Sequence, residues 1–398
     1  MADTLHSTIG RGILKPRQRK IMLVAGEESG DIYAGRLISQ LRDRMDNLAV
    51  EGIGGQRMRE AGGATFYDIA QMSSVGVSSM LGCIGFFLKV LREMKQKISS
   101  GEYEALIIID YPDFNMRLAK AADAAGIPVF YYVAPQFWAW RSYRIHAVKR
   151  WVDMMFVVFP FEEEFYKGWG VPARFSGHPI LDELQMEGLD REALRAEFGA
   201  HAGQILLGLL PGSRNGEVNR MFPLMLDAVK IIRATKPVKI VAACADSVDL
   251  GMMRRLAQAA GDDPLIVKGR TWEVMNACDF LLCKSGTSTL QAAIAGTPMA
   301  IVYKSDTFSY MLAKSLAHVK WAGLPNLVAG REIAPELIQW SATPQNVAAA
   351  ALPYLTSQAK RDHMRGELGK IRLLLGGKGA AGRAADNIAG FLQRLRNP

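Results

Sequence analysis

The fold of this chain is decided by the stretch Ile107-Ile108-Ile109-Asp110-Tyr111-Pro112-Asp113-Phe114-Asn115. An apolar run that begins at Ala105 ends abruptly in a carboxylate, and Pro112 cannot continue the hydrogen-bonded ladder of a strand. The run therefore predicts a buried strand of a parallel sheet. Because ligands of open α/β sheets bind outside the carboxyl ends of the strands, we expect Asp110 to meet a substrate there, on a rigid support.

Short apolar strands alternate with helical segments on both sides of this stretch. The alternation stops at a polar, helix-prone segment over residues 182–199 and then restarts, which predicts an α/β protein with two Rossmann-like halves. The strands are expected at 21–25, 50–55 (with its turn), 105–109, 129–133, 154–158, 204–210, 238–243, 264–267, 280–282 and 298–303.

This pattern divides the chain into four segments. They are a basic flexible tail over 1–20, an N-terminal Rossmann-like domain over 21–185, a C-terminal Rossmann-like domain over 186–350 and a helical segment over 351–398. A glycine-rich interruption at 376–382 divides the helical segment, which can pack back on either half.

The balance of charge indicates an anionic partner. The chain has 48 Lys and Arg against 39 Asp and Glu, a formal net charge of +9, which suits phosphate esters, an anionic membrane surface or nucleic acid. The hydrophobic content of 49% is that of a globular protein. The four cysteines lack the spacing of a zinc site or a disulfide framework, and the tail lacks the apolar region of a signal peptide. Both features are typical of a reduced, cytoplasmic protein with buried thiols.

An uncharged stretch over 69–88 is nearly as long as a membrane span, but its glycines, serines and Gln71 make it too polar for one. We expect a loop and then an amphipathic helix over 81–98, where basic residues flank an apolar cluster. This combination suits a membrane interface or acyl chains, although a core-facing helix with solvated lysines explains it as well. The cluster includes Met80, Leu81, Ile84, Phe86 and Phe87.

Aromatic and basic residues follow the strand expected at 129–133. They lie in the loop 134–141, which contains Trp138 and Arg141. Such side chains contact anionic or lipid substrates, or pack within the protein. They also stack on nucleobases, but no nucleic-acid-binding motif accompanies them, so we expect no nucleic acid partner.

The turn after the first strand, Gly26-Glu27-Glu28-Ser29-Gly30-Asp31, lacks the G-x-G-x-x-G pattern of dinucleotide sites. Gly26, Glu27 and Ser29 could hold a sugar or phosphate oxygen at the start of the following helix. A plain tight turn capped by Ser29 or Asp31 fits the spacing equally well.

Two turns of the second half share a design that suits anions. In each, a strand ends in small and hydroxyl residues that begin a helix, which leaves unpaired backbone N–H groups at the positive end of the helix dipole. Arg214 adds a bidentate phosphate donor beside Ser213, and Gly286 permits close backbone approach between Ser285 and Thr287. Neither turn matches the P-loop, so a diphosphate that is held rather than cleaved is favoured.

An ordered set of segments makes the sequence resemble lipid-A-disaccharide synthase, a family of inverting glycosyltransferases with the GT-B fold. The matching segments are Val24-Ala25-Gly26-Glu27 with Ser29-Gly30-Asp31; Gly54-Gly55 with Arg57-Met58; Ile109-Asp110 with Pro112-Asp113-Phe114-Asn115; Trp138-Ala139-Trp140-Arg141; Pro160-Phe161-Glu162; Gly177-His178-Pro179; Leu210-Pro211-Gly212-Ser213-Arg214 with Glu217-Val218; Ser285-Gly286-Thr287; and Leu324-Pro325-Asn326-Leu327.

The resemblance implies two Rossmann-like domains that face each other across a cleft. It implies transfer of 2,3-diacylglucosamine from UDP to the 6-hydroxyl of 2,3-diacylglucosamine 1-phosphate, with inversion and release of UDP. Asp110 matches the family's general base, Arg214 and Asn326 match polar residues of its donor site, and the turn 285–287 matches its UDP-diphosphate site. We expect neither a cofactor nor a metal.

Gln291 departs from the family, in which a Glu that binds the donor ribose is expected at this place. An amide oxygen can still accept a hydroxyl proton, but the charge-assisted bond is lost, so weaker donor binding or a changed donor is expected. The segment 77–80 also lacks an expected Glu.

Acylated substrates would place the protein at a membrane. Each buried CH₂ contributes about 0.8 kcal/mol of membrane affinity, so multiply acylated sugars do not dissolve freely. We therefore expect a peripheral protein on the inner face of the inner membrane, with an anionic membrane surface as a partner. The sequence leaves a homodimer open.

Other interpretations stay open at this point. One is an isomerase resembling UDP-N-acetylglucosamine 2-epimerase, and another is a non-catalytic, lipid-associated protein that binds a sugar nucleotide. Asp110 could merely cap a turn or helix, and Asp113 is placed to cap a helix that begins at Asn115. His178, before a proline at the boundary of the halves, is expected to be a hydrogen-bonded hinge residue rather than a base.

Overall fold

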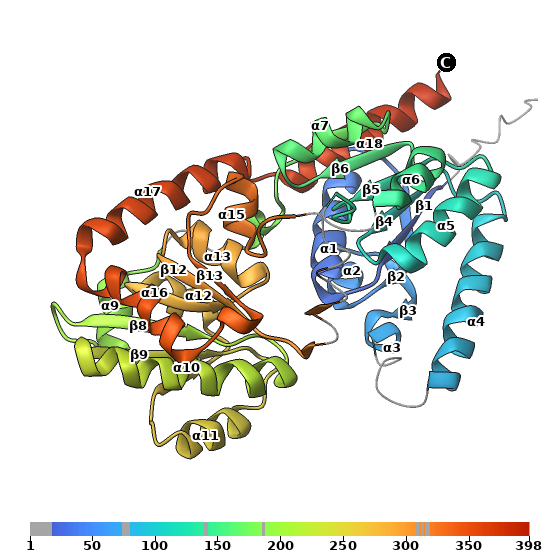
Figure 1. The fold of residues 1–398 in the computed structure, drawn as a ribbon. Coiled ribbons are helices and arrows are strands. Elements are labelled where there is room, and N and C mark those ends of the chain that lie inside the picture. The colour runs from blue at the N-terminus through green and yellow to red at the C-terminus, as the bar shows by residue number, and fades with distance from the viewer. Residues whose placement is uncertain are drawn as a thin grey trace, which may run out of the picture.

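The structure, a computed structural model, describes residues 18–73, 80–138, 142–184, 188–307, 310–311, 314 and 319–397. These residues form two lobes, each built on a parallel sheet with helices packed against it (Figure 1). The α/β class, with two Rossmann-like domains and C-terminal helices that pack back, is confirmed. Arg19 and Lys20, which the sequence assigned to the tail, instead begin the first strand and pair with Glu104 and Glu102.

The sheet of the first lobe has the strand order β3-β2-β1-β4-β5-β6-β7. Strand order reverses between β1 and β4, where Ala25 pairs with Ile109. At such a switch point a crevice opens beyond the carboxyl ends of the strands, so the Gly26 turn and Asp110 border the same crevice. The strands are β1 (Arg19–Ala25), β2 (Leu48–Gly54), β3 (Ala64–Asp68), β4 (Ala105–Ile109), β5 (Val129–Tyr132), β6 (Met154–Val157) and β7 (Ala173–Phe175).

The helices of the first lobe follow the apolar periodicity of the sequence. In α4, which confirms the helix predicted over 81–98, Val90, Leu91, Met94 and Ile98 are buried against the sheet. The helices are α1 (Glu28–Arg42), α2 (Gln56–Glu60), α3 (Ile69–Ser73), α4 (Met80–Ile98), α5 (Pro112–Ala124), α6 (Ile145–Trp151), α7 (Pro160–Gly168) and α8 (Ile180–Glu183).

The sheet of the second lobe has the strand order β10-β9-β8-β11-β12-β13, with its switch point between β8 and β11. Cys244, Cys278 and Cys283 of this lobe are buried free thiols, as predicted, and the side chain of Cys83 lies outside the described part of the structure. The elements are α9 (Arg191–Glu197), β8 (Ile205–Leu210), α10 (Asn215–Thr235), β9 (Val238–Cys244), α11 (Leu250–Ala259), β10 (Leu265–Lys268), α12 (Thr271–Ala277), β11 (Phe280–Lys284), α13 (Thr287–Ala295), β12 (Met299–Tyr303), α15 (Leu324–Ala329), β13 (Glu336–Ile338), α16 (Pro344–Thr356), α17 (Gln358–Leu374) and α18 (Ala380–Arg396).

The chain crosses between the lobes twice, and the two crossings touch. The Asp182 carboxylate accepts hydrogen bonds from the backbone N–H groups of Gly379 and Ala380, at 2.6 and 3.1 Å, where α18 begins. The apolar face of α18 then packs on α1 in the first lobe (Figure 1). The C-terminal segment is therefore shared, with α17 on the second lobe and α18 on the first.

The structure corrects three details of the expected elements. The short strands β3, β7 and β13 were not predicted, and β13 rather than β12 closes the second sheet. Helix α5 begins at Pro112, because proline lacks the N–H that an N-terminal helix position leaves unused. Asp113 therefore lies inside the helix and pairs with Arg144, so it does not cap a helix at Asn115.

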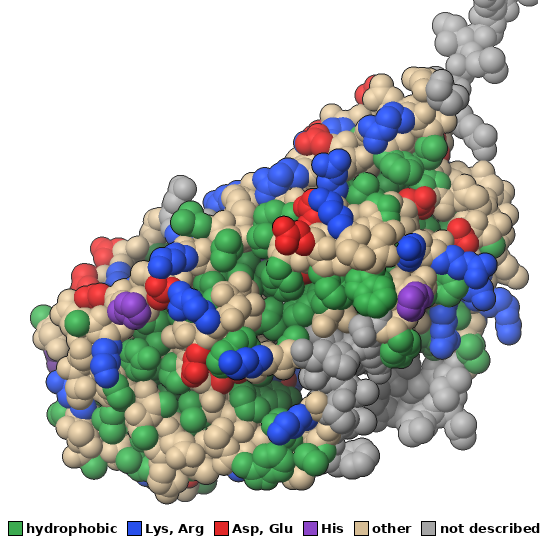
Figure 2. Space-filling model, turned by 45° about the horizontal axis from the view of Figure 1, so that its top comes forward, with side chains coloured by type: hydrophobic (Ala, Val, Ile, Leu, Met, Phe, Trp, Pro, Cys, Tyr) green, Lys and Arg blue, Asp and Glu red, His purple; other side chains and the backbone are tan. Residues whose placement is uncertain are grey.

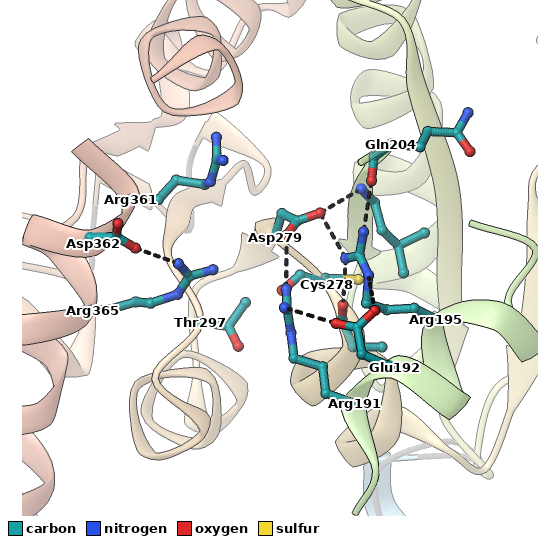
Figure 3. Close-up of polar contacts among 12 residues, drawn as sticks. Arg191, Glu192, Arg195, Gln204, Cys278, Asp279, Thr297, Arg361, Asp362 and Arg365 are labelled. Carbon is teal, nitrogen blue, oxygen red and sulfur yellow. Dashed lines mark hydrogen bonds and ion pairs between the residues drawn. The ribbon is translucent and has the colours of Figure 1, made fainter. Parts of the chain in front are cut away.

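A buried ionic network holds the amino edge of the second sheet, as Figure 3 shows. Asp279 accepts hydrogen bonds from the Leu206 N–H and from the guanidinium groups of Arg195 and Arg191, each at 2.8 Å. Burial alone would raise the pKa of Asp279, but these hydrogen bonds outweigh it and the pKa is lowered. The network lies at the edge opposite to the ligand-binding edge, so it ties α9 to the sheet rather than forming a site.

Candidate active site

Asp110 stands at the end of β4 on a strained backbone. Asp110 and Tyr111 have φ of 49° and 45°, a left-handed conformation that costs a non-glycine residue roughly 1–3 kcal/mol. The buried Asn115 amide donates to the carbonyl oxygens of Ile109 and Asp110, at 3.1 and 2.7 Å. The Tyr131 hydroxyl donates to the Asp110 carbonyl at 2.8 Å. Three hydrogen bonds from two side chains therefore hold the backbone that aims the Asp110 carboxylate. Such over-determined strain is typical of functional sites.

The turn after β1 lies directly against this backbone. A Cβ atom on Gly26 would lie 2.3 Å from Cγ of Tyr111, so only glycine fits. Burial, together with the negative charge of Glu27 in the same turn, raises the pKa of Asp110 above the ordinary value for an aspartate. A carboxylate of raised pKa is a stronger proton acceptor once it is ionised.

Asp31 does not cap the helix that it begins. Its buried carboxylate accepts from the backbone N–H groups of Gly55, Arg57 and Met58, at 2.6, 2.9 and 3.1 Å, and so caps α2 instead. Ser29 is exposed, and no side chain of the described residues caps α1. The interpretation of a plain turn capped by Ser29 or Asp31 is therefore wrong, and the first N–H groups of α1 have no side-chain cap among the residues that the structure describes.

The aromatic loop also leaves its strand with strain. Val133, directly after β5, has a φ of 57°, which is rare for a β-branched residue. Trp138 is half-buried and its indole N–H donates to the Glu162 carboxylate at 2.7 Å. Burial, opposed by this bond and by two backbone N–H donors, raises the pKa of Glu162 to about 7. Packing within the protein thus explains the position of Trp138 in this loop. Arg141 lies outside the described residues.

Loops from the carboxyl edges of both sheets meet in one small pocket. Its volume is about 290 Å³, and its walls are mostly apolar. Trp138 and Phe161, which follow β5 and β6, form one side, and residues that follow β12, including Trp321 and Leu327, form the other. On the face shown in Figure 2, hydrophobic side chains gather across the middle of the molecule, with lysines and arginines around them.

The first of the two turns that are predicted to bind an anion lies between β8 and α10. Ser213 and Arg214 are exposed, and no side chain of the described residues caps the helix. Gly212 has a φ of 132°, and a Cβ there would lie 2.7 Å from Oε2 of Glu217 in the first turn of α10. The Ser213 N–H donates to the same oxygen at 3.3 Å.

The second of these turns lies beside the first, because β8 and β11 are neighbouring strands. Gly286 begins α13, again without a side-chain cap among the described residues, and Thr287 is exposed. The Ser285 hydroxyl donates to the carbonyl of Ala322 at 2.9 Å, which ties the turn to the loop after β12.

An ion pair that the sequence did not single out joins the two turns. The Lys284 ammonium, at the end of β11, lies 2.9 Å from Oε1 of Glu217. A charged residue directly after the apolar run of β11 is the same signal that identified Asp110, and it could have identified Lys284. Nothing in the sequence pairs it with Glu217, because the two residues are 67 positions apart.

Asn326 is buried, and both the nitrogen and the oxygen of its side-chain amide form two hydrogen bonds within the protein. Its NH₂ group donates to Ala334 and Glu336 at 2.7 and 2.8 Å, and its oxygen accepts from the N–H groups of Ile333 and Ala334. Glu336 in turn accepts from the Ala322 N–H, next to the Ser285 turn. Asn326 therefore positions this loop. Gln291, on α13, is half-buried, and the structure gives its side chain no hydrogen bond to any described residue.

The apolar cluster of α4 divides between the core and the surface. Phe86 and Phe87 are half-buried, with their rings against Tyr67 and Phe114, so they serve the core. Leu88 is 46% exposed and lines a shallow groove of about 560 Å³ that also contains Arg92 and Lys95. The side chains of Met80, Leu81 and Ile84 lie outside the described part of the structure.

His178 is buried and hydrogen-bonded at the boundary of the lobes, as predicted, and its role as a hinge stays a prediction. Its backbone N–H donates to the carbonyl of Leu375 at 2.9 Å, and its Nδ1 accepts from the Ile180 N–H at 3.2 Å. Burial lowers the pKa of its imidazole to about 3, so the ring is neutral at physiological pH. It therefore joins the two crossings between the lobes.

Two features are absent from the ranges that the structure describes. None of the helices in those ranges combines the length and apolar character needed to cross a membrane. No group of three or more His, Cys, Asp or Glu side chains is placed to hold a metal ion within the same ranges.

Comparison with solved structures shows the fold. The calicheamicin glycosyltransferase CalG4 matches with a TM-score of 0.61 and 15% identity, over 96% of this chain and 100% of that one. A UDP-GlcNAc 2-epimerase from Neisseria meningitidis, bound to UDP-GlcNAc, matches with a TM-score of 0.58 and 11% identity, over 94% and 100%. At these identities the likeness extends to the architecture alone.

Comparison of sequences is more specific. Residues 21–377 match the family model described as lipid-A-disaccharide synthetase. The lipid-A-disaccharide synthase of Geobacter sulfurreducens is 40% identical over 374 residues, 94% of this chain and 97% of the relative. That of Myxococcus xanthus is 36% identical over 374 residues, with the same coverage of both chains. The chain therefore belongs to the lipid-A-disaccharide synthase family of glycosyltransferases.

Proposed function

We propose that this chain transfers 2,3-diacylglucosamine from UDP to the 6-hydroxyl of 2,3-diacylglucosamine 1-phosphate, with inversion at the anomeric carbon and release of UDP. The observation that carries the proposal is the meeting of the two carboxyl edges in one pocket. The residues that line this pocket come from both edges, and this supports the proposal because β4 of one edge ends at Asp110 and β8 and β11 of the other lead into the two turns that suit an anion.

Asp110 acts as the general base in this proposal. Its carboxylate takes the proton of the acceptor 6-hydroxyl while the oxygen attacks the anomeric carbon of the donor. The bond from that carbon to the diphosphate oxygen breaks, and its electron pair leaves with UDP. Attack from the face opposite to the leaving group inverts the configuration. The raised pKa of Asp110 supports this role, because it brings the acid closer to neutral pH.

The second lobe holds the donor in this proposal. The N–H groups at the starts of α10 and α13 face the diphosphate, with the hydroxyl groups of Ser213, Ser285 and Thr287 beside them. Arg214 offsets the charge that develops on the leaving UDP. Gln291 accepts a hydrogen bond from a ribose hydroxyl. Asn326 acts indirectly, through the loop that it positions.

The acceptor side of the proposal lies in the first lobe. Glu27, Ser29 and the exposed start of α1 border the Asp110 crevice and bind the acceptor sugar. The exposed part of α4, where Leu88 lies beside Arg92 and Lys95, contacts the acyl chains and anionic headgroups at the inner face of the inner membrane. The cytoplasmic, membrane-peripheral location follows from the acylated substrates.

Mass spectrometry of products tests the proposal. The full chain is incubated with UDP-2,3-diacylglucosamine and 2,3-diacylglucosamine 1-phosphate in mixed micelles, with the Asp110→Asn variant as the control. We expect an acylated disaccharide and UDP from the wild type alone. An epimerised UDP-sugar, which has the same mass as the donor and is identified by proton NMR of the same mixture, would favour the isomerase interpretation. Substrates unchanged by both measurements would favour a binding protein.

A further inference from the structure

The Lys284–Glu217 ion pair lies where the donor diphosphate would be bound. Its ammonium is 2.9 Å from the carboxylate, and the two side chains are only 18% and 25% exposed. The pair connects the end of β11 to the first turn of α10, so it spans both anion-binding turns. The Lys284 nitrogen also lies 3.6 Å from the position of a Cβ on Gly286 and 5.4 Å from the centre of the Tyr303 ring.

Glu217 uses both of its oxygens on positive groups that a phosphate would also bind. Oε1 contacts the Lys284 ammonium, and Oε2 accepts from the Ser213 N–H. The Ser213 bond is long, at 3.3 Å, and therefore weak. A carboxylate and a phosphate both present anionic oxygens that accept hydrogen bonds from an ammonium or a backbone N–H. The two groups therefore compete for the same donors.

We propose that, without a bound UDP-sugar, Glu217 binds the Lys284 ammonium and the Ser213 N–H. When the UDP-sugar binds, its diphosphate replaces the Glu217 carboxylate as the partner of both groups. This inference rests on the proposed function and adds two residues to the donor site. Lys284 becomes a direct ligand of the diphosphate, and Glu217 becomes an internal competitor that keeps Lys284 between the two turns.

The competition predicts opposite effects for the two partners. Replacing Lys284 removes a charge-assisted bond to phosphate, so UDP binds more weakly. Replacing Glu217 removes a negative charge that the diphosphate must displace, so UDP binds more tightly. A purely structural ion pair predicts something else, because loss of either partner would then weaken the turns and weaken UDP binding.

Another ion pair of α10 supplies matched controls. Lys230 and Asp227 are also 2.9 Å apart, but they are about half exposed and lie along the same helix, away from its start. Lys230→Met and Asp227→Asn therefore repeat the chemistry of Lys284→Met and Glu217→Gln on a surface pair that should contribute little.

Titration calorimetry with UDP and with uridine tests the inference on the full chain. We expect Lys284→Met to bind UDP about ten- to hundredfold more weakly and to bind uridine as the wild type does. Glu217→Gln should bind UDP severalfold more tightly, and the control variants should match the wild type. The affinity of Lys284→Met should also depend less on salt, because one cation has been removed.

The outcomes separate this inference from the proposed function. If the wild type forms the disaccharide but Lys284→Met binds UDP normally, Lys284 is no diphosphate ligand and the inference is overturned alone. If Glu217→Gln weakens UDP binding, the competition is overturned. If the wild type binds no UDP at all, the proposed function fails first. Thermal unfolding and circular dichroism show that each variant is folded, and Lys284→Arg, which keeps the charge, should retain most of the UDP affinity if Lys284→Met does not fold.

Discussion

The carboxyl edges of the two sheets share one architecture and carry opposite chemistry. In the first lobe, β4 ends in the half-buried carboxylate of Asp110, on a backbone strained at Asp110 and Tyr111. In the second lobe, β8 and β11 end in turns that begin helices, with the cations Arg214 and Lys284 beside them. The comparison teaches that the Rossmann-like fold supplies a binding edge, whereas the residues that end the strands decide what the edge does.

The strain is also divided unequally between the edges. Positive φ values fall on non-glycine residues at the ends of β4 and β5, whereas the turns after β8 and β11 place glycine at Gly212 and Gly286. Gln339, which follows β13 with a φ of 55°, is the exception at the second edge. A base must be aimed within a fraction of an ångström of a reacting proton, whereas an anion is held by several adaptable donors. The first edge therefore has non-glycine residues in costly conformations at the proposed base, and the turns at Gly212 and Gly286 do not need them.

The largest effect is expected when Asp110, the proposed base at the first edge, is replaced. In Asp110→Asn the side chain keeps its size but cannot accept the proton, so we expect kcat to fall by roughly 10² to 10⁴. The affinity for UDP should be unchanged, because the turns proposed to bind UDP belong to the other lobe. Initial rates and titration calorimetry measure the two effects. An equal loss of UDP affinity would show that proton transfer and UDP binding are not functions of separate edges.

The second test removes a cation from the other edge. Arg214→Met should weaken UDP binding by about 10- to 100-fold, since a hydrogen bond between charged groups contributes roughly 1.5–3 kcal/mol. Arg220, exposed on the same helix, offers a matched control, and Arg220→Met should bind UDP as the wild type does. Similar affinities for the two variants would contradict the placement of the diphosphate.

The third test disturbs the support of Asp110 without touching its side chain. A Cβ on Gly26 would lie 2.3 Å from the Tyr111 ring, so Gly26→Ala should displace the strained backbone and destabilise the fold by about 1–3 kcal/mol. We expect a lower kcat with an unchanged affinity for UDP. Chemical denaturation and initial rates measure this. Gly366→Ala is the control, because Gly366 lies on α17 with open space around it. If both variants lost kcat equally, contact between residue 26 and Tyr111 would not be the cause.

The smallest test changes only the charge beside Asp110. The negative charge of Glu27 contributes to the raised pKa of Asp110, so Glu27→Gln should lower that pKa. Because the base must be ionised, the acid limb of kcat/KM against pH should move to lower pH. A profile recorded for the variant and for Glu28→Gln, which changes the neighbouring exposed carboxylate, checks the direction. A shift toward higher pH would contradict it.

Much of the fold could be predicted because parallel strands are buried on both faces. The runs that became β1, β4, β8 and β11 are apolar without alternation, and this pattern is visible in one sequence. The strands β3, β7 and β13 were missed, because they have only 3 to 5 residues and are partly exposed. Their pairing comes from neighbouring strands rather than from their own sequence.

The sequence by itself determined the chemical groups of the site: a carboxylate after an apolar strand at Asp110, and two turns that suit an anion at 211–214 and 285–287. Tertiary structure alone decided how these groups work. The αL backbone at Asp110, the saturated amide of Asn326 and the Lys284–Glu217 pair all depend on partners from other elements. The physical reason is that residue types limit local chemistry, whereas burial, strain and pairing arise between segments that only the folded chain brings together.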